Sequence, residues 1–292
     1  MKEEINGIII INKPKGYTSH DVVAKVKKIL NIKKVGHTGT LDPNATGVLP
    51  LLLNQGTKLS QYLIEHDKQY EVTLQLGIKT DTADGEGVVL QEERVNWKKI
   101  DENLQEVMEA MIGKQEQIPP IYSAIKVKGK KLYEYARKGQ TVEIEPRKIE
   151  IYKITLQEIQ KEENQIKFEV SCSKGTYIRS LCEDIASKLG TIGYMKELNR
   201  TQVGRFHIRN SITIEELEKR KEQINQTIIT MQELFKEYPK ISLEEKEYQK
   251  FLNGVKLLKN KEDGIYNIYQ KEEYIGIGII KEKKLKRDII LA

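Results

Sequence analysis

The chain has 292 residues, of which 38% are hydrophobic and 32% are charged, and its formal net charge is +6. This composition is typical of a globular protein and excludes collagen-like, fibrous and disordered classes. The small positive excess is compatible with a polyanionic partner such as nucleic acid, but it does not require one.

The number of cysteines and the length of the apolar runs exclude two further classes, disulfide-rich proteins and membrane-spanning proteins. Cys172 and Cys182 are the only cysteines, which is too few for a disulfide framework or a four-cysteine zinc site. The N-terminal residues include acidic ones, and the longest apolar run, 48–53, is too short to span a membrane. We therefore expect a cytoplasmic protein with reduced cysteines and no membrane segment.

The first half of the chain alternates between strand and helix patterns. Residues 8–11 predict a buried strand that ends in a turn at 12–16, and Ser19 is expected to cap the helix that follows. Residues 69–78 alternate in polarity as in a strand. Residues 81–87 superficially resemble a calcium loop but lack oxygen ligands at two of its positions, so a turn is expected.

The second half continues the mixture. It predicts a helix at 104–112, strands at 150–156 and 166–173, and a helix at 177–189. After Pro239 a short helix at 243–252 precedes strands at 264–269, 274–280 and 288–291. Since strands and helices do not follow a strict βαβ repeat, we expect a mixed-sheet α/β or α+β fold with a β-rich tail.

One stretch, GHTGTLDPNATGVLP at 36–50, holds a single acid, Asp42, among small and turn-forming residues. A lone loop Asp is usually a turn former or a helix cap. Here Pro43 stiffens the chain directly after the acid, and Gly39 and Gly47 permit a close approach of backbone. The pattern therefore favours a rigidly presented carboxylate.

This stretch resembles the signature of the TruB family of tRNA pseudouridine synthases, in which the matching Asp is catalytic. The resemblance extends over further segments, namely 12–19, 70–85, 119–137, 174–181 and 198–204. The tail, at 263–278, resembles more weakly the RNA-binding PUA domain that ends many members. The chain departs from the usual pattern at Asn44 and Asn199, where larger or basic residues are common.

The resemblance implies the architecture. It implies an α+β pseudouridine synthase fold, with a mixed, mostly antiparallel β-sheet and flanking helices, plus a small C-terminal PUA-like β-barrel. The catalytic domain would span 1–237, with a thumb-like, RNA-binding insertion at about 119–146, and the PUA-like RNA-binding domain would span 238–292.

The resemblance also implies the reaction, which is isomerisation of uridine to pseudouridine at position 55 in the T loop of tRNA. The base leaves its ribose at nitrogen, turns, and rejoins through carbon 5, so the reaction is redox-neutral and no cofactor is expected. The catalytic residues implied are Asp42, Arg179 as its ion-pair partner, and Tyr70, which would stack on the flipped base. Whether Asp42 attacks covalently or abstracts a ribose proton stays open.

Other residues match substrate-binding positions of the family. Tyr177 and Leu198 would wall the pocket, His37 would enter the space left by flipped bases, and Lys13 would support the catalytic loop. Arg200 would contact the phosphate backbone. Each also has an ordinary structural reading: without the motif, Tyr70 and Tyr177 would be packing aromatics, and His37 would be a turn histidine bonded to backbone.

Basic residues gather in the thumb-like insertion, where Lys126 and Arg137 would neutralise phosphates of the RNA. The ordinary meaning of such a charge run is a solvated helix face. In the tail, Lys281 to Arg287 gives a second basic stretch, which either reaches the tRNA or merely belongs to a stabilising domain.

Three other functions compete with this one. The guide-RNA-dependent synthases share the Asp motif but normally have a more developed tail and partner proteins. A catalytically silent RNA chaperone would use the same surfaces. A glycoside hydrolase would need two facing carboxylates, and no second acid stands convincingly beside Asp42 in these motifs. We expect a monomer that acts on the T arm of tRNA without an obligatory protein partner.

Overall fold

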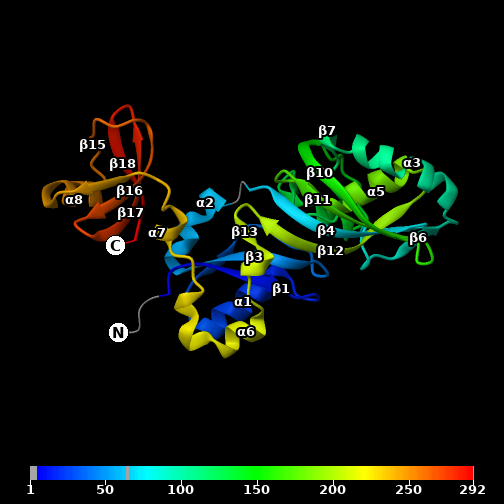
Figure 1. Cartoon of the computed structure of the whole chain (residues 1–292), viewed down its shortest axis with the longest axis horizontal. Helices are drawn as coiled ribbons and strands as arrows, with labels where there is room; N and C mark the ends of the chain where they lie inside the picture. Colours follow the sequence, from blue (N-terminus) through cyan, green and yellow to red (C-terminus); the bar gives the residue numbers. More distant parts are fainter. Residues whose placement is uncertain (1–4, 64–65, 292) are drawn as a thin grey trace.

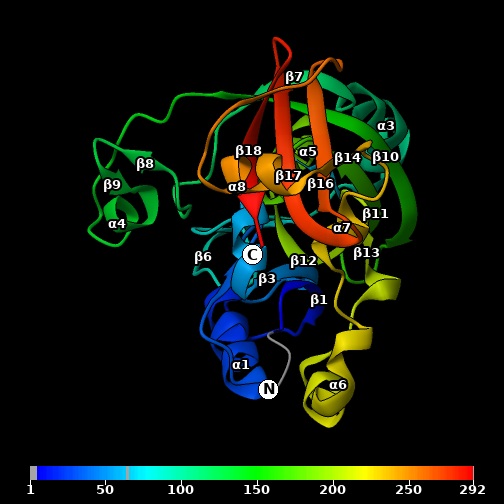
Figure 2. The same ribbon diagram turned by 90° about the vertical axis from the view of Figure 1, so that its left-hand side faces the viewer.

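A computed structural model of the chain describes residues 5–63 and 66–291. A large mixed sheet with helices forms the body, and a second, smaller sheet lies at one end (Figure 1). The body carries an insertion that projects away from it, seen most clearly in Figure 2.

The large sheet has nine strands, and seven of them follow the order β1-β3-β12-β4-β11-β10-β7. Strand β2 pairs with β3, and β13 pairs with β12. All pairings are antiparallel except that of β12 with β3, which is parallel. The strands are β1 (Gly7–Lys13), β2 (Val35–His37), β3 (Thr46–Leu53), β4 (Lys68–Leu76), β7 (Gly113–Gln117), β10 (Arg147–Gln160), β11 (Gln165–Cys172), β12 (Gly193–Val203) and β13 (Phe206–His207).

The helices flank this sheet, which confirms the expected α+β class with a mostly antiparallel sheet (Figure 1). Helices α3 and α5 pack over the β4, β11 and β10 region through one apolar cluster, and α1 and α6 pack against β1 and β3 through another. The helices are α1 (Ser19–Leu30), α2 (Ser60–Leu63), α3 (Trp97–Ala110), α5 (Ile178–Lys188), α6 (Ile214–Lys219) and α7 (Met231–Leu234), with 3-10 turns η1 (Asn54–Leu59), η2 (Ile208–Asn210) and η3 (Lys221–Gln226).

The prediction that Ser19 caps the first helix is wrong. Thr18 is the N-cap residue of α1 and forms a capping box with Asp21, whereas Ser19 is already helical. The Ser19 side chain bonds instead to the backbone of Leu41, 22 residues away. Helix α3 also starts earlier than predicted, because the Asn96 side chain caps it by accepting from the Lys99 amide.

The expected turn at 81–87 is present and is framed by a two-stranded sheet of β5 (Ile78–Thr80) and β6 (Val89–Glu92). Its acidic side chains accept hydrogen bonds from nearby groups of the same segment: Asp84 accepts from the Thr82 hydroxyl and from the Glu86 amide, and Asp81 accepts from the Val88 amide. The turn is therefore internally tied, and it lies close to the N-terminus of α5.

The projecting insertion lies between β7 and β10 and occupies the position of the expected thumb. It contains a short hairpin of β8 (Lys126–Val127) and β9 (Lys130–Lys131), followed by helix α4 (Leu132–Ala136). Figure 2 shows it standing away from the sheet. Leu132 is fully buried in the insertion, which has only a small core of its own.

The C-terminal sheet has five strands in the order β14-β16-β17-β18-β15, with α8 (Glu245–Leu252) packed beside it. Its first strand begins at Lys240, close to the expected domain boundary. The PUA-like barrel thus takes the form of a curled sheet with edges at β14 and β15. The strands are β14 (Lys240–Leu243), β15 (Leu257–Leu258), β16 (Gly264–Gln270), β17 (Glu273–Lys281) and β18 (Lys284–Ile290).

This sheet is docked on the body through both apolar and polar contacts. Ile277 and Ile289 belong to the same buried cluster as residues of β1, β3 and α7. The Tyr62 hydroxyl donates to the Asp288 carboxylate at 2.6 Å, and Lys58 donates to the Ile290 carbonyl at 2.7 Å. Strands β17 and β18 therefore join the small sheet to the body.

None of the helices in the described residues has both the length and the apolar character needed to cross a bilayer.

Candidate active site

Asp42 lies on the loop between β2 and β3, and this loop is tied to α1 at its base. The Ser19 hydroxyl accepts from the Leu41 amide at 2.9 Å and donates to the Leu41 carbonyl at 3.2 Å. Leu41 and Ala45, on either side of Asp42, are buried in the apolar cluster under the sheet. The two apolar neighbours anchor the loop, and the carboxylate projects between them.

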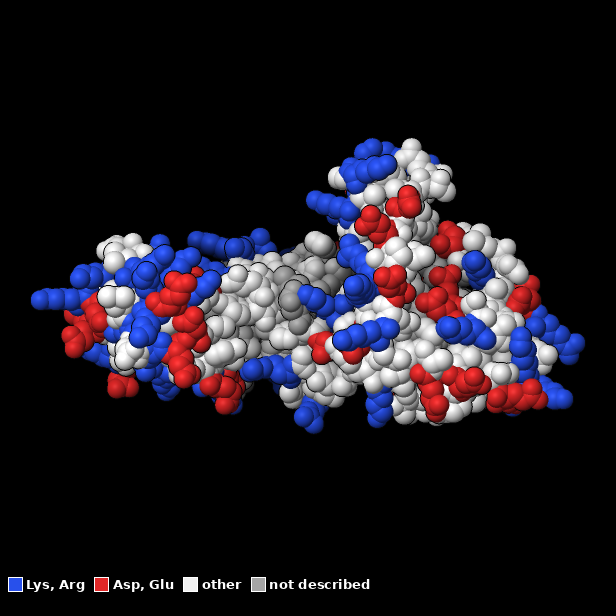
Figure 3. Space-filling view, turned by 90° about the horizontal axis from the view of Figure 1, so that it is seen from above, with Lys and Arg blue, Asp and Glu red and all other residues white. Residues whose placement is uncertain are grey.

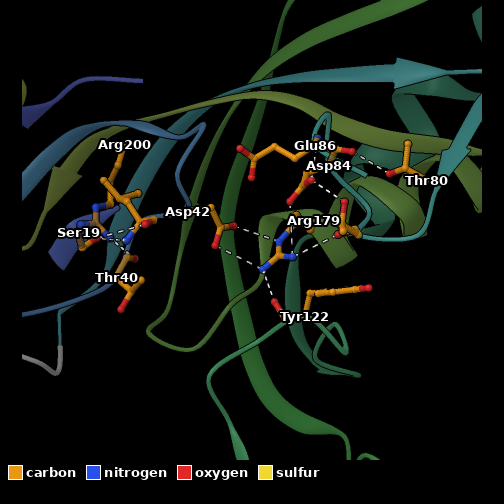
Figure 4. Close-up of polar contacts among 11 residues, drawn as sticks. Ser19, Thr40, Asp42, Thr80, Asp84, Glu86, Tyr122, Arg179 and Arg200 are labelled. Atoms are coloured by element: carbon orange, nitrogen blue, oxygen red, sulfur yellow. Dashed lines mark hydrogen bonds and ion pairs between the residues drawn. The ribbon is translucent and has the colours of Figure 1, made fainter. Parts of the chain in front are cut away.

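Two buried cations hold the backbone of this loop. Lys13 is fully buried and donates to the carbonyls of Pro43, Pro14 and Tyr17. Arg200 is 2% exposed and donates to the carbonyls of Val48, Thr40 and Gly39 (Figure 4). Buried charges need such partners, and several carbonyl dipoles supply them without a competing carboxylate.

The sequence on either side of Asp42 is uncharged and rich in glycine for this reason: the loop offers its own carbonyls to the buried cations and allows a close approach of backbone. Gly47 shows the steric side of the requirement, because its φ is +105° and an added Cβ would lie 2.2 Å from the Arg200 carbonyl oxygen. A larger residue there would push the loop off β12.

The contacts of Arg200 do not support the phosphate contact expected from the sequence. Its guanidinium faces inward, and its three nitrogens donate to the loop carbonyls of Gly39 and Thr40 and to the Val48 carbonyl of β3. A side chain with 2% exposure has no surface to offer an RNA backbone. Lys13, by contrast, makes the contacts that support of the catalytic loop requires.

Arg179, in the first turn of α5, brings several segments together at Asp42. Its Nε lies 3.1 Å from Asp42 Oδ2, and its Nη2 lies 3.5 Å from Oδ1, so the two groups meet side-on. The same guanidinium donates to the carbonyls of Tyr122 at 2.9 Å and Thr82 at 3.2 Å. Figure 4 shows it at the centre of these contacts.

A second acid does lie in the site, contrary to the expectation from the motifs. Asp84 Oδ2 is 3.6 Å from Arg179 Nη1, so one guanidinium is shared by Asp84 and Asp42 (Figure 4). Asp84 is 9% exposed and its other oxygen is occupied by Thr82 and the Glu86 amide. It braces Arg179, since its oxygens already have partners within the protein.

Asp42 is the acid that a ligand can reach. Its side chain is 36% exposed, against 13% for Asp84 and 7% for Arg179. Burial of the carboxyl by the surrounding protein raises the pKa of Asp42, and the Arg179 charge opposes this rise. Asp84 adds to the rise and Lys13 opposes it. The site thus holds a reachable carboxylate whose ionisation depends on its arginine.

The aromatic and aliphatic residues expected at the pocket share one apolar cluster with the Asp42 loop. Tyr70 on β4 is 7% exposed and Leu198 on β12 is 8% exposed, and both pack with Leu41 and Ala45. Burial raises the pKa of Tyr70 to about 12, which favours the neutral phenol. Tyr177 is the N-cap residue of α5, two residues before Arg179.

His37 lies on β2, five residues before Asp42, and is half-buried. Its ring meets that of His20 edge-on, with 5.5 Å between the ring centroids. Burial lowers the pKa of His37, and the neighbouring His20 and Arg200 charges lower it further. The imidazole is therefore neutral at physiological pH.

Lys126 and Arg137 lie on the thumb and not at the carboxylate. Both are exposed, and the Arg137 guanidinium lies 5.3 Å from the centre of the Tyr133 ring, with Lys131 at the same distance. Figure 3 shows Lys and Arg side chains on the lobe that projects from the body. The insertion at 119–146 contains six basic and three acidic residues.

A hollow of about 500 Å³ lies beside these strands. Its lining includes Glu71, Val72 and Thr73 of β4, Leu198 and Asn199 of β12, and Asn44 of the Asp42 loop. Asn199 donates to Glu71 at 2.7 Å. Asp42 and Arg179 do not line it, but Leu198, which was expected to wall the pocket for the base, does.

The sequence pointed to Asp42, Tyr70 and Arg179 through motifs, but it missed three contributors. All three lie in segments that resemble the family's motifs, but Asp84 was assigned only to a turn, Ser19 only to a cap, and Tyr122 to no role. Within the described ranges, His, Cys, Asp and Glu side chains form no cluster of three or more that could hold a metal ion.

Comparison with known proteins decides the family. The model of the TruB family pseudouridylate synthase N-terminal domain matches residues 27–178, and that of the tRNA pseudouridylate synthase B C-terminal domain matches residues 179–253. The chain belongs to the TruB family of pseudouridine synthases. This family catalyses isomerisation of uridine to pseudouridine.

Curated relatives of similar length support the assignment. A protein of Clostridium tetani named tRNA pseudouridine synthase B is 46% identical over 94% of this chain and 95% of its own. One of Caldanaerobacter subterraneus with the same name is 43% identical over 97% of this chain and 98% of its own. The TruB match therefore extends over nearly the whole chain.

Solved structures of a related synthase show the same fold. The chain superposes on one from a structure titled a Cbf5-Nop10-Gar1 complex with a TM-score of 0.68, 28% identity and coverage of 97% of this chain and 83% of that one. A chain from an H/ACA RNP bound to a substrate RNA gives a TM-score of 0.69 at 26% identity, covering 98% and 85%. These matches cover both the catalytic sheet and the C-terminal sheet.

Proposed function

We propose that this TruB-family enzyme isomerises uridine 55 in the T loop of tRNA, alone and in the cytoplasm. The observation that carries the proposal is the reachable Asp42 carboxylate paired side-on with Arg179 beside the Tyr70 and Leu198 cluster. The names of the curated relatives support tRNA as the substrate.

In this function Asp42 acts in the ionised form on a uridine that has been flipped out of the T loop. The bond between C1′ of the ribose and N1 of the base breaks, a bond between C1′ and C5 forms, and the proton on C5 is lost while N1 gains one. No electrons are gained or lost overall. Arg179 keeps Asp42 charged and oriented, and Tyr70 and Leu198 exclude water from the separated base.

Four other residues act on the RNA rather than on the reaction. His37, neutral and at the mouth of the loop, fills the space left by the flipped nucleotides, and Tyr177 closes the pocket beside α5. Lys126 and Arg137 of the thumb bind phosphates of the T arm, which gives affinity without reading sequence. We assign residues 1–237 to the catalytic domain and 238–292 to a PUA-like RNA-binding domain.

The test is tritium release from a T-arm transcript that contains uridine labelled at carbon 5. Purified enzyme without any guide RNA or partner protein should release tritium from the target uridine, and Asp42→Asn should release none while binding the RNA with unchanged affinity. Release that requires a guide RNA would instead support the guide-dependent function. Binding without release by wild-type enzyme would support the RNA chaperone.

A further inference from the structure

Hydrogen bonds join the root of the thumb, residues 117–122, to the first turn of α5. Gln117, which makes two of these bonds, lies outside the segments that resemble the family's motifs. The thumb begins directly after β7, where Gln117 is the last strand residue. Helix α5 begins after Tyr177 and carries Arg179, the partner of Asp42. These two points are 60 residues apart in sequence and in contact in the fold.

Gln117 makes the central contact. Its side-chain Oε1 accepts from the Tyr177 amide at 2.8 Å, and its Nε2 donates to the Tyr177 carbonyl at 3.1 Å. The side-chain amide thus pairs with both polar groups of one backbone residue, as a neighbouring strand would. Gln117 is 4% exposed, so water does not compete for these bonds.

Two further bonds join the same segments. The Ser180 hydroxyl donates to the Ile118 carbonyl at 3.0 Å, and Arg179 Nη2 donates to the Tyr122 carbonyl at 2.9 Å. Residues before, at and after Arg179 are therefore each bonded to the thumb root. The helix start cannot shift against the thumb without breaking buried hydrogen bonds.

We propose that Gln117 is a positioning residue that couples the thumb to the Arg179–Asp42 pair. When the thumb binds the RNA, its root keeps the N-terminus of α5 in the position that holds Arg179 side-on to Asp42. Binding through the phosphates of the RNA is then transmitted to the carboxylate. The inference rests on the proposed function and names a residue that acts on its catalytic pair from outside the pocket.

The charged groups that face Asp42 determine how its ionisation would change if α5 were held less firmly. They are Arg179 from α5, Asp84 and Glu86 from the turn at 81–87, and Lys13 from β1. Arg179 is the cation whose position depends on Gln117, while the acids of the turn remain in place. Loss of Gln117 therefore weakens the favourable partner of the Asp42 carboxylate and leaves the repulsive ones.

The chain offers a matched control. Gln75 on β4 is also a buried glutamine, 7% exposed, and its Nε2 donates to the carbonyls of Glu163 and Asn164. These partners lie in the β10–β11 turn, away from α5. Gln75→Met and Gln117→Met each remove a buried amide of the same kind, but only the second contacts the helix that carries Arg179.

The experiment measures single-turnover tritium release at saturating T-arm RNA, together with RNA affinity and urea unfolding, for both variants. Gln117→Met should lower the rate about 30-fold, because small misplacements of catalytic groups cost on the order of 100-fold. RNA affinity should stay within about threefold, and the acidic limb of the pH–rate profile should move to higher pH. Gln75→Met should lose about as much stability as Gln117→Met, but its rate should stay within about twofold of wild type.

Ser180→Ala is the second variant, and it keeps the result decisive if Gln117→Met does not fold. Alanine is favourable in a helix, and this change removes only the bond to the Ile118 carbonyl. It should lower the rate in the same direction by about threefold with unchanged affinity. An active wild type in which Gln117→Met and Ser180→Ala behave like Gln75→Met would overturn the inference, whereas an inactive wild type would instead overturn the proposed function.

Discussion

Asp42 and Arg179 meet side-on, with Nε 3.1 Å from Oδ2, although 137 residues separate them in the chain. The arginine is almost fully buried and the aspartate is reachable. Burial raises the pKa of the carboxyl, and the Arg179 charge opposes this rise and so favours the ionised form. The pair thus makes the chemistry sensitive to both the geometry and the charge of Arg179.

Replacing Arg179 should change the pH dependence as well as the rate. The rate of wild-type enzyme should fall as pH falls through the raised pKa of Asp42. In Arg179→Met the opposing charge is gone, so the pKa rises further and the acidic limb moves to higher pH. Arg179→Lys keeps a charge but loses the planar fork and two carbonyl contacts, so it should fall between the two.

Single-turnover rates between pH 5 and 8 measure this effect. RNA affinity serves as the control, since the pair does not bind phosphates. An acidic limb that stays at the wild-type pH in Arg179→Met would show that Arg179 does not control the ionisation of Asp42.

Arg200 should prove structural. Arg200→Met removes the donor to the carbonyls of Val48, Thr40 and Gly39, of which only the bond to Val48 is fully buried. An unsatisfied buried group costs about 1–3 kcal/mol, so the free energy of unfolding should fall by about that amount. The salt dependence of RNA binding should be unchanged. A slope of log K against log salt that falls by about one would instead indicate a lost phosphate contact.

The sequence could predict the elements whose signals are local. The alternation of β4 and the apolar face of α5 are visible within a window of ten residues, and both elements are confirmed. The catalytic loop was visible through its small residues and Pro43. Such signals depend on spacing along the chain, which the fold does not alter.

The contacts that arrange the site could not be predicted, because they join distant segments. Thr18 and Ser19 are equally good caps by composition, and the choice depends on the contact of Ser19 with Leu41. Arg200 was expected to be exposed, as arginines usually are. Its burial follows from loop carbonyls about 160 residues away, for which no local pattern exists.

The thumb should supply affinity rather than chemistry. Lys126→Ala with Arg137→Ala should reduce the slope of log K against log salt by about two and weaken RNA binding at moderate salt. The rate at saturating RNA should change little, because neither residue reaches Asp42. Lys98→Ala, an exposed lysine on α3, is the control and should leave the slope unchanged. If Lys98→Ala reduced the slope by as much per residue as the two thumb substitutions do, the thumb would have no special role in RNA binding.

Because of Lys13, alkaline pH should lower the rate of the reaction but raise the stability of the fold. Burial lowers its pKa from 10.5 to about 8, while its ammonium group donates to three carbonyls, one of them next to Asp42. Above pH 8 the amine loses a proton and can no longer donate to all three. The catalytic loop is then held less firmly, so the rate should fall.

The free energy of unfolding changes in the opposite direction to the rate. Between pH 8 and 10.5 the unfolded chain keeps a proton on Lys13 that the folded chain has released. The free energy of unfolding contributed by this group therefore rises with pH over that window. Measured against Lys13→Met, which has no charge to bury, wild type should gain stability from pH 7.5 to pH 10 as its activity declines. A wild-type stability that falls relative to Lys13→Met over this range would show that Lys13 is not held with a lowered pKa.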